Sequence, residues 1–196
     1  MEKISSVINS MKIQAPVKKI AEKIFASESI TTDDALMLYQ SNDMALLGVL
    51  AGVVKKRLSD EFVYFNRNFH IEPTNICVNH CKFCSYRRHQ GQKGAWECSI
   101  EDILADVEKY TARGATEVHI VGGVHPDRNV NFYADMLKSI KKAAPGLHIK
   151  AFTAVEIDQM CQMGNVSVEE GLKILKEAGL ESMPGGGAEI FDETLR

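Results

Sequence analysis

Three cysteines lie within eight residues of one another and could together bind a metal cluster. Cys77, Cys81 and Cys84 have the spacing C-x₃-C-x₂-C. Thiolates are the usual ligands of iron–sulfur clusters, and a [4Fe–4S] cube normally takes four of them. Three thiolates in one short loop would therefore leave one iron open to another ligand. The spacing predicts a [4Fe–4S] cluster with three cysteine ligands.

A zinc site is the structural alternative for the same cysteines. A Cys₃His site would take His80 or His89 as its fourth ligand. Zinc sites more often use C-x₂-C pairs separated by a longer loop, and His80 lies directly beside Cys81. We expect Cys98 and Cys161, which lie far from the cluster, to be packing or incidental thiols.

The composition limits the class of protein. Hydrophobic residues make up 45% of the 196 residues and charged residues 25%, as in ordinary globular proteins, and the formal net charge is −3. The slight excess of acidic over basic residues argues against a nucleic-acid-binding protein, which would show a basic excess. No apolar run approaches the roughly 18 residues of a membrane span. The odd number of cysteines and the absence of a signal-like N-terminus predict a cytoplasmic protein without a disulfide framework.

The predicted strands and helices, which must position the cysteines, alternate along the chain. Residues 1–60 predict a helical N-terminal region, and residues 61–196 an α/β core. Residues 62–65 are β-prone, and further strands are expected at 69–72, 117–121, 147–152 and 180–183. Helices are expected at 99–113, 131–144 and 168–178. Strands that alternate with helices favour a parallel sheet, whose active site lies at the carboxyl ends of the strands.

The length indicates an incomplete barrel. A full (β/α)₈ barrel needs about 250 residues, and only four β/α units fit after the helical region. We therefore expect the N-terminal part of a barrel preceded by a helical cap, and a sequence that is a fragment of a longer protein.

The cysteine motif resembles the signature of the radical S-adenosylmethionine (SAM) superfamily. Phe83 supplies the aromatic residue before the last cysteine, and the loop follows the first expected strand. The resemblance implies a partial (β/α)₆ TIM-type barrel. It also implies that SAM, a co-substrate, chelates the open iron through its amino and carboxylate groups. The reduced cluster then cleaves SAM into methionine and a 5′-deoxyadenosyl radical.

Within the superfamily, the sequence resembles the aminofutalosine synthases of menaquinone biosynthesis. The resemblance is carried by residues 70–77, 84–88, 119–127, 148–157 and 182–189. It implies a transferase that adds the adenosyl radical to 3-[(1-carboxyvinyl)oxy]benzoate, with aryl migration and loss of carbon dioxide, to give 6-amino-6-deoxyfutalosine. It also implies an electron donor such as flavodoxin or ferredoxin. The alternatives are cyclic dehypoxanthine futalosine synthase, another radical SAM relative, or an inactive metal-binding fragment.

The resemblance also implies roles for residues around the cluster. Phe83 corresponds to the position beside the SAM adenine, and Gly122 and Gly123 to backbone that hydrogen-bonds the SAM amino group. Glu156 could accept hydrogen bonds from the ribose hydroxyls. The structural alternatives are loop packing for Phe83, a plain turn for the glycines, and a solvated or ion-paired carboxylate for Glu156.

Three further residues are weaker catalytic candidates. Glu72 would point into the barrel or outward, and His125 would meet a substrate carboxylate or cap the next helix. Arg87 and its neighbour Arg88 could pair with the carboxylates of SAM or of the benzoate, because guanidinium groups bind carboxylates well.

Overall fold

The computed structural model describes residues 13–186, 192 and 194. The chain divides into two compact units, residues 1–65 and residues 66–196. The last run that carried the family resemblance, 182–189, is described only as far as residue 186. The expected division into domains at residue 60 stays a prediction.

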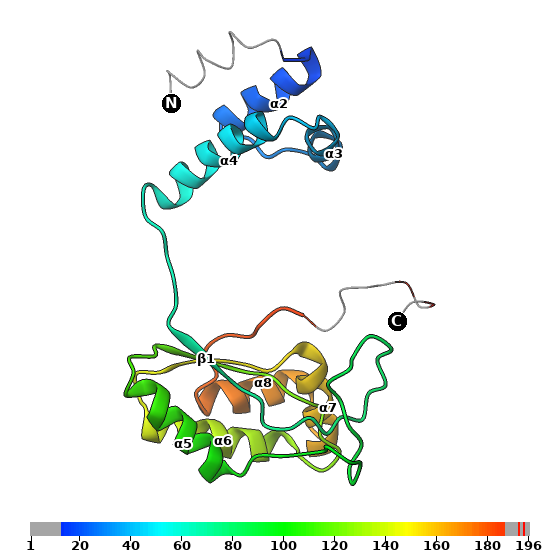
Figure 1. Ribbon diagram of the computed structural model, residues 1–196, viewed down its shortest axis with the longest axis vertical. Coiled ribbons are helices and arrows are strands. Elements are labelled where there is room, and N and C mark those ends of the chain that lie inside the picture. The colour runs from blue at the N-terminus through cyan, green and yellow to red at the C-terminus, as the bar shows by residue number, and fades with distance from the viewer. Residues whose placement is uncertain (1–12, 187–191, 193, 195–196) are drawn as a thin grey trace. The chain divides into compact units, whose positions relative to one another are not determined.

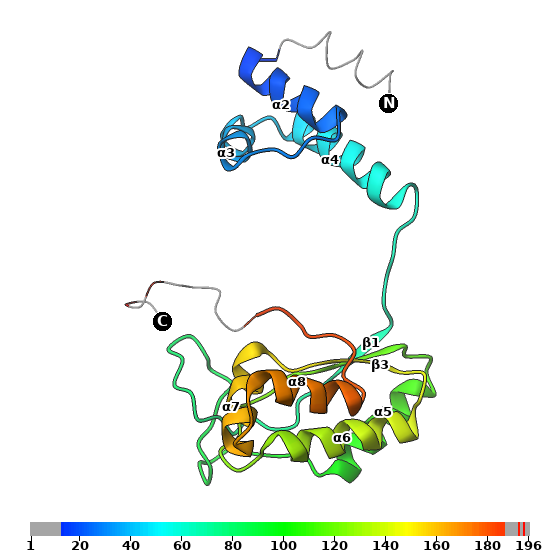
Figure 2. The ribbon, with the colours of Figure 1, turned by 180° about the vertical axis from the view of Figure 1, so that it is seen from behind.

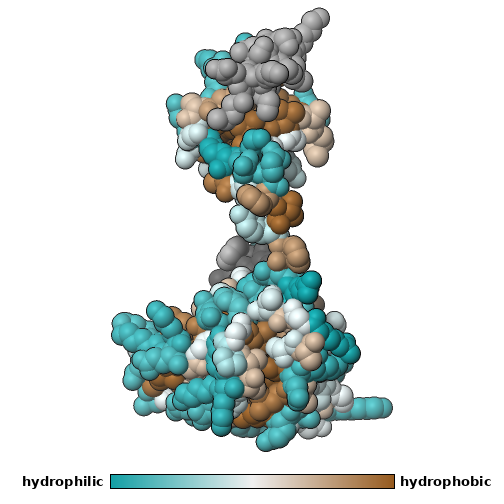
Figure 3. Space-filling view, turned by 90° about the vertical axis from the view of Figure 1, so that its left-hand side faces the viewer, coloured by the Kyte–Doolittle hydropathy of each residue, from teal (hydrophilic) through white to brown (hydrophobic). Residues whose placement is uncertain are grey.

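The described residues of the N-terminal unit form three helices, and the sequence predicts a helical region here. They are α2 (Ala15–Phe25), α3 (Thr32–Gln40) and α4 (Met44–Ser59). Side-chain caps set two helix starts, because Thr31 accepts a hydrogen bond from Asp34 N and Asp43 accepts one from Leu46 N. The helices bury one small hydrophobic core made of Val17, Ile20, Ala21, Ile24, Leu38, Leu46, Leu50 and Val53. Figure 3 shows that hydrophobic side chains also reach the surface.

The segment of residues 62–65 forms no strand, although its residue types favour one. Phe62, Val63, Tyr64 and Phe65 are 67–82% exposed and pair with no strand among the described residues. The sequence prediction was wrong here because β-propensity measures the fit of a side chain to a packed, pleated surface. This segment contacts no such surface and joins the two units as an extended linker.

A parallel sheet organises the second unit, which confirms the predicted fold class. Its strands β1 (Asn68–Ile71), β2 (Glu117–Ile120) and β3 (His148–Ala151) lie in the order β1-β2-β3. The fourth expected strand is reduced to one parallel bridge between Lys150 and Ser182. Pro184 follows two residues later and has no N–H group with which to extend the pairing.

Helices cover one face of the sheet. The helices are α5 (Ile100–Thr111), α6 (Val130–Ala143), α7 (Ala154–Gly164) and α8 (Val168–Glu177). Figures 1 and 2 show α5, α6 and α8 on the same side of the strands. Alternate strand residues join them in one core, for example Phe69, Val118 and Ile149. The opposite face of the sheet carries polar side chains and no helix of the described part of this unit.

The sequence analysis missed α7. Thr153 and Glu156 form a capping box at its start, in which each side chain binds the other residue's backbone N–H. The T-x-x-E pattern that precedes Ile157 is the sequence signal for such a start. None of the described helices is long and apolar enough to cross a membrane.

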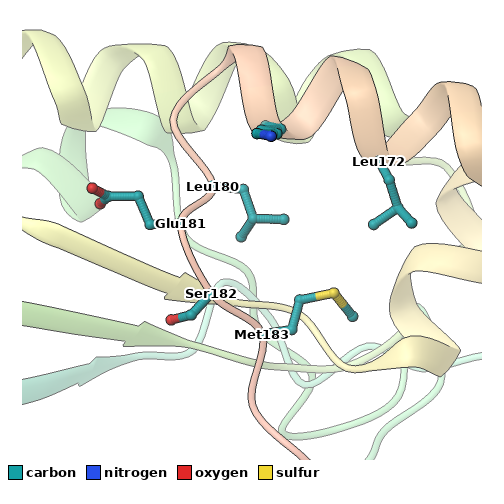
Figure 4. A pocket seen from close by; sticks show the side chains of 6 residues that line it. Leu172, Leu180, Glu181, Ser182 and Met183 are labelled. Carbon is teal, nitrogen blue, oxygen red and sulfur yellow. The ribbon is translucent and has the colours of Figure 1, made fainter.

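The outer edge of β3 borders a shallow apolar pocket. Its volume is about 650 Å³, and Leu172 of α8 lines it together with Leu180 and Met183 of the following segment. Figure 4 shows these three side chains turned toward the same space. The pocket therefore lies at the place where a further β/α unit of a barrel would pack.

Candidate active site

The loop that follows β1 holds the cysteines and begins with a buried segment. Thr74, Asn75 and Ile76 are at most 5% exposed. The Thr74 hydroxyl accepts a hydrogen bond from Ile76 N (3.0 Å) and donates one to the Trp96 carbonyl (2.8 Å). The segment is thus fixed in place immediately before Cys77.

Main-chain hydrogen bonds join the start of the cysteine loop to the segment at its end. Asn75 O accepts from Arg88 N at 2.8 Å, and Cys77 N donates to Arg88 O at 3.0 Å. The Asn75 side chain adds two bonds, accepting from Trp96 N (2.9 Å) and donating to Gly94 O (2.9 Å). A ladder of hydrogen bonds therefore joins the start of the cysteine loop to its end.

The two glycines after β2 lie against the start of this loop. Gly123 N donates to Thr74 O at 2.7 Å. A Cβ atom on Gly122 would lie 2.9 Å from Thr74 O, and one on Gly123 would overlap the Ile76 carbonyl group. Only glycine permits this approach of two backbones. Neither glycine carbonyl oxygen accepts a hydrogen bond from the described residues; Gly122 is half-buried and Gly123 is buried.

The three motif cysteines lie beyond this anchored segment. Cys77 and Cys84 are half-buried, and Cys81 is exposed. Cys84 N donates to Cys81 O at 3.1 Å, which brings these two residues into one turn. Over the described ranges, no three His, Cys, Asp or Glu side chains meet closely enough to hold a metal ion. The donor set still fits an iron–sulfur cluster, because three free thiols lie in one loop at the carboxyl edge of a parallel sheet.

The histidines of the zinc alternative lie together in the same loop. The rings of His80 and His89 are 4.8 Å apart, and Arg87 Nη1 lies 2.9 Å from His89 Nε2. The structure thus places both histidines beside one another, but it assembles neither of them with the cysteines into a metal site over the described residues.

Phe83 and the two arginines differ in how the loop holds them. Phe83 is 58% exposed, so its ring is available to a ligand. Arg88 donates to the carbonyl oxygens of Ser85 (3.0 Å), Tyr86 (3.3 Å) and Arg87 (2.7 Å). Arg88 therefore stabilises the loop, whereas Arg87 contacts the side chain of His89.

Glu156 has a structural position that the sequence analysis did not anticipate. The residue is 8% exposed. Its Oε1 accepts from Gly122 N (3.0 Å), and its Oε2 accepts from Thr153 N and Oγ1 (2.7 Å each). Burial raises the pKa of this carboxyl, although these hydrogen bonds oppose the change. Glu156 thus joins the start of α7 to the glycine pair and is neither solvated nor ion-paired.

His125 is buried in a polar cluster. Its Nδ1 accepts from Asp127 N at 3.0 Å, and its Nε2 lies 3.3 Å from Glu97 Oε2. Arg128 binds the same Glu97 oxygen at 2.6 Å. Burial and the charge of Arg128 lower the pKa of His125. The suggestion that His125 caps the next helix was wrong, because Asn129 is the N-cap of α6.

Glu72 points to solvent at the rim of the sheet. It is exposed and accepts a hydrogen bond from the Tyr86 hydroxyl at 3.1 Å. Burial, followed by the hydrogen bond to Glu72, raises the pKa of Tyr86. The ring of Tyr86 meets that of Trp96 edge to face. Glu72 therefore orients an aromatic side chain of the cysteine loop.

Comparisons with known proteins agree with this arrangement. The family model described as "Radical SAM superfamily" matches residues 71–196. An aminodeoxyfutalosine synthase of Thermus thermophilus is 40% identical over 90% of this chain and 48% of its own length, and one of Streptomyces coelicolor is 38% identical over 91% and 46%. A cyclic dehypoxanthine futalosine synthase of Halalkalibacterium halodurans is 34% identical over 90% and 48%. The chain thus spans about half the length of these relatives.

Solved structures show the same fold at low identity. The FeFe-hydrogenase maturase HydG from Carboxydothermus hydrogenoformans has a TM-score of 0.61 at 14% identity and covers 94% of this chain and 51% of its own. Methylornithine synthase (PylB) has a TM-score of 0.57 at 16% identity, with 85% and 58% covered. Each likeness concerns the fold alone.

Proposed function

The chain belongs to the radical SAM superfamily, and within it we propose the reaction of an aminofutalosine synthase. The observation that carries the proposal is the identity to the two synthases, 40% and 38%. The cyclic dehypoxanthine futalosine synthase is 34% identical, and a 5-amino-6-(D-ribitylamino)uracil–L-tyrosine 4-hydroxyphenyl transferase of Methanothermobacter thermautotrophicus is 35% identical. The substrate would be 3-[(1-carboxyvinyl)oxy]benzoate and the product 6-amino-6-deoxyfutalosine.

The family implies a [4Fe–4S] cluster and SAM, and we assign the cluster ligands to Cys77, Cys81 and Cys84. When bound, the cluster and SAM supply the 5′-deoxyadenosyl radical that adds to the enol-ether double bond before aryl migration and loss of carbon dioxide. The chain itself binds and orients the reactants and excludes water. Its anchored loop entrance holds Cys77, while Cys81 and Cys84 stay accessible for loading.

The surrounding residues support SAM in this proposal. The carbonyl oxygens of Gly122 and Gly123 would accept hydrogen bonds from the SAM amino group, and the exposed ring of Phe83 would pack beside the adenine. Glu156 would act through Gly122, whose N–H it binds, rather than by touching the ribose. Arg87 would pair with a carboxylate, and a flavodoxin or ferredoxin would supply the electron.

Mass spectrometry of the products tests the proposal. The protein, at its full natural length, would be loaded anaerobically with iron and sulfide and incubated with dithionite, SAM and 3-[(1-carboxyvinyl)oxy]benzoate. We expect an adenosyl adduct that has lost carbon dioxide. Turnover of dehypoxanthine futalosine instead would assign the chain to the alternative reaction, and 5′-deoxyadenosine without any adduct would reject both substrates.

Two cysteine variants form a matched pair for the ligand assignment. Cys81→Ser changes an exposed motif residue and should lower the bound iron and abolish 5′-deoxyadenosine formation. Cys98→Ser changes a half-buried thiol outside the motif and should leave both unchanged. Equal iron content in the two variants would reject Cys81 as a ligand.

A further inference from the structure

The open face of the sheet carries a row of three basic side chains. His70, His119 and Lys150 are register partners in β1, β2 and β3. Their neighbours in the strands, such as Phe69 and Ile120, are buried in the core beneath the helices. Because side chains alternate along a strand, the three basic residues lie together on the opposite face, which none of the described helices of the second unit covers.

The row is closely spaced and has unused hydrogen-bonding capacity. The rings of His70 and His119 are 4.5 Å apart. Nε2 of His119 is buried and has no hydrogen-bond partner among the residues that the structure describes. Buried polar atoms are nearly always paired, so this nitrogen calls for a partner that the described chain does not supply.

Two carboxylates, Glu72 and Glu117, lie beside the row, and other groups already bind both. Glu72 accepts a hydrogen bond from the Tyr86 hydroxyl, and His70 also lines a pocket with Asp102 and Asp106. Glu117 Oε1 is 3.3 Å from Lys150 Nζ and 3.4 Å from Asn68 Nδ2, and Oε2 accepts from Asn66 Nδ2 at 3.1 Å. The Lys150 side chain is 30% exposed, so its ammonium group can donate to a second acceptor. Burial, with the charges of His70 and Lys150, lowers the pKa of His119, which leaves a neutral ring with one N–H donor.

The position of the row suits a group that lies away from the reacting atoms. The three residues precede the carboxyl ends of their strands by one position. The first cysteine follows the end of β1 by six residues, in the loop above that edge. A substrate that reacts at the cysteine loop would therefore extend its remote end down toward this row.

We propose that His70, His119 and Lys150 form a carboxylate subsite that binds the aryl carboxylate of the substrate. This inference rests on the proposed function and deepens it, because that substrate has two carboxylates. The carboxylate of the enol-ether group leaves as carbon dioxide and must lie near the radical. The aryl carboxylate remains in the product and lies at the far side of the ring, where the row can hold it by charge-assisted hydrogen bonds.

Paired substrates and variants test the subsite in the cluster-loaded protein at full length. The second substrate, (1-carboxyvinyl)oxybenzene, lacks the aryl carboxylate. Lys150→Met should lower kcat/KM for the carboxylated substrate by about 10- to 100-fold, mainly through KM, and should change kcat/KM for the second substrate little. Lys150→Arg should restore most of the loss. Lys142→Met, which removes an exposed lysine of α6, is the matched control.

The exposed residue of the row gives a second variant. His70→Ala removes a side chain outside the core and should show the same selective loss, while 5′-deoxyadenosine formation without substrate should stay at the wild-type level in Lys142→Met. A loss in Lys150→Met that is equal for the two substrates would overturn the subsite, because it would show a structural effect only.

A binding measurement without turnover distinguishes a wrong assignment of the subsite from a wrong assignment of the reaction. Calorimetry with 3-methoxybenzoate, and with methoxybenzene as the uncharged probe, needs neither SAM nor a reductant. We expect the wild type to bind only the acid, and Lys150→Met to bind it at least about tenfold more weakly. Absence of adduct with retained binding would reject the reaction and keep the subsite, whereas equal binding by wild type and Lys150→Met would reject the subsite.

Discussion

The backbone contact at Gly123 fixes the cysteine loop against β2. In Gly123→Ala the new methyl group would overlap the Ile76 carbonyl group, one residue before the first cysteine. We expect a loss of about 1–3 kcal/mol in the free energy of unfolding, as for other overpacked sites, and a lower iron content after loading. Chemical denaturation and iron analysis measure the two effects.

Gly146→Ala is the control for this prediction. Nothing lies within 4 Å of a Cβ at Gly146, which belongs to the same unit. The control should match the wild type in stability and in iron content. A Gly123→Ala protein that also matched the wild type would show that the loop does not depend on this contact.

The carboxylate of Glu156 gives a second prediction at the residue scale. Glu156→Gln keeps the size of the side chain but places an NH₂ group against one of the donors that the carboxylate binds, either Gly122 N or Thr153 N. We expect a stability loss of about 1–3 kcal/mol, because a buried donor is left unsatisfied. Thermal unfolding measures it. An unchanged stability with a raised KM for SAM would instead favour direct contact with the ribose.

The chemical roles of single residues could be predicted from the sequence only where a local sequence motif indicates them. The spacing of Cys77, Cys81 and Cys84 predicts the cluster, and the family resemblance predicts that Gly122 and Gly123 bind the SAM amino group through their backbone; both stay predictions. The contact of Gly123 with Thr74 and Ile76 could not be foreseen, because it depends on the pairing of β1 with β2. The position of Glu156 likewise depends on its long-range contact with Gly122.

At the scale of elements, Glu181 joins α6 to the segment after α8. Its Oε2 accepts from Lys141 Nζ (2.7 Å) and from Ile149 N (2.9 Å). Burial favours the neutral acid, but these hydrogen bonds outweigh it and hold the pKa of Glu181 below its ordinary value of 4.5. A carboxyl with a lowered pKa stabilises the fold above its unfolded-state pKa, and this contribution is lost as the pH falls through the lowered value.

Glu181→Gln should therefore be less stable than the wild type at pH 7, by up to about 1 kcal/mol. The difference should disappear as the pH falls below 4.5 and through the lowered pKa. Urea denaturation across this range measures it. Asp135→Asn, which breaks a pair whose side chains are 62% and 70% exposed, should show little difference at either pH. A constant difference for Glu181→Gln would exclude the ion pair as the cause.

Close packing of α7 on α8 gives another prediction. A Cβ on Gly171 would overlap Cys161 Sγ, so Gly171→Ala should destabilise the protein by about 1–3 kcal/mol. Cys161→Ala removes the sulfur and makes room for the methyl group. The double variant should therefore lose less stability than the sum of the two single variants. Strict additivity in a double-mutant cycle would contradict the contact.

The sequence predicted elements well where a cap and a regular pattern coincide. Ser99 and Ser167 cap α5 and α8 as expected. The helix α7 was missed although Thr153 and Glu156 carry the capping signal, because this signal directly follows the strand expected at 147–152. The fourth strand failed for a tertiary reason, since only Ser182 reaches the edge of β3.

At the scale of the whole molecule, we propose that the linker of residues 62–65 marks the boundary between two domains. Its aromatic side chains are exposed and belong to no helix or strand. Limited proteolysis with chymotrypsin should therefore cut first at Phe62, Tyr64 or Phe65. Mass spectrometry should find two fragments that resist further cleavage. A first cut within α4 or β1 would contradict this boundary.

The architecture of the second unit explains how half of a barrel can be a compact body. Its buried apolar side chains form one core between the sheet and the helices. The other face is polar and is the face we assign to the substrate. The apolar pocket beside Leu172, Leu180 and Met183 lies at the outer edge of β3, and the relatives are about twice as long as this chain.

The ladder that holds the cysteine loop also bears on how such enzymes diversify. Its bonds join main-chain atoms of Asn75, Cys77 and Val78 to those of Arg88, Trp96 and Val124, and every substitution except one to proline, which lacks the N–H group, keeps these atoms. Side chains in the loop and on the open face can therefore drift in evolution while the cluster stays in place. A scaffold of this kind can exchange one substrate for another without rebuilding its radical source.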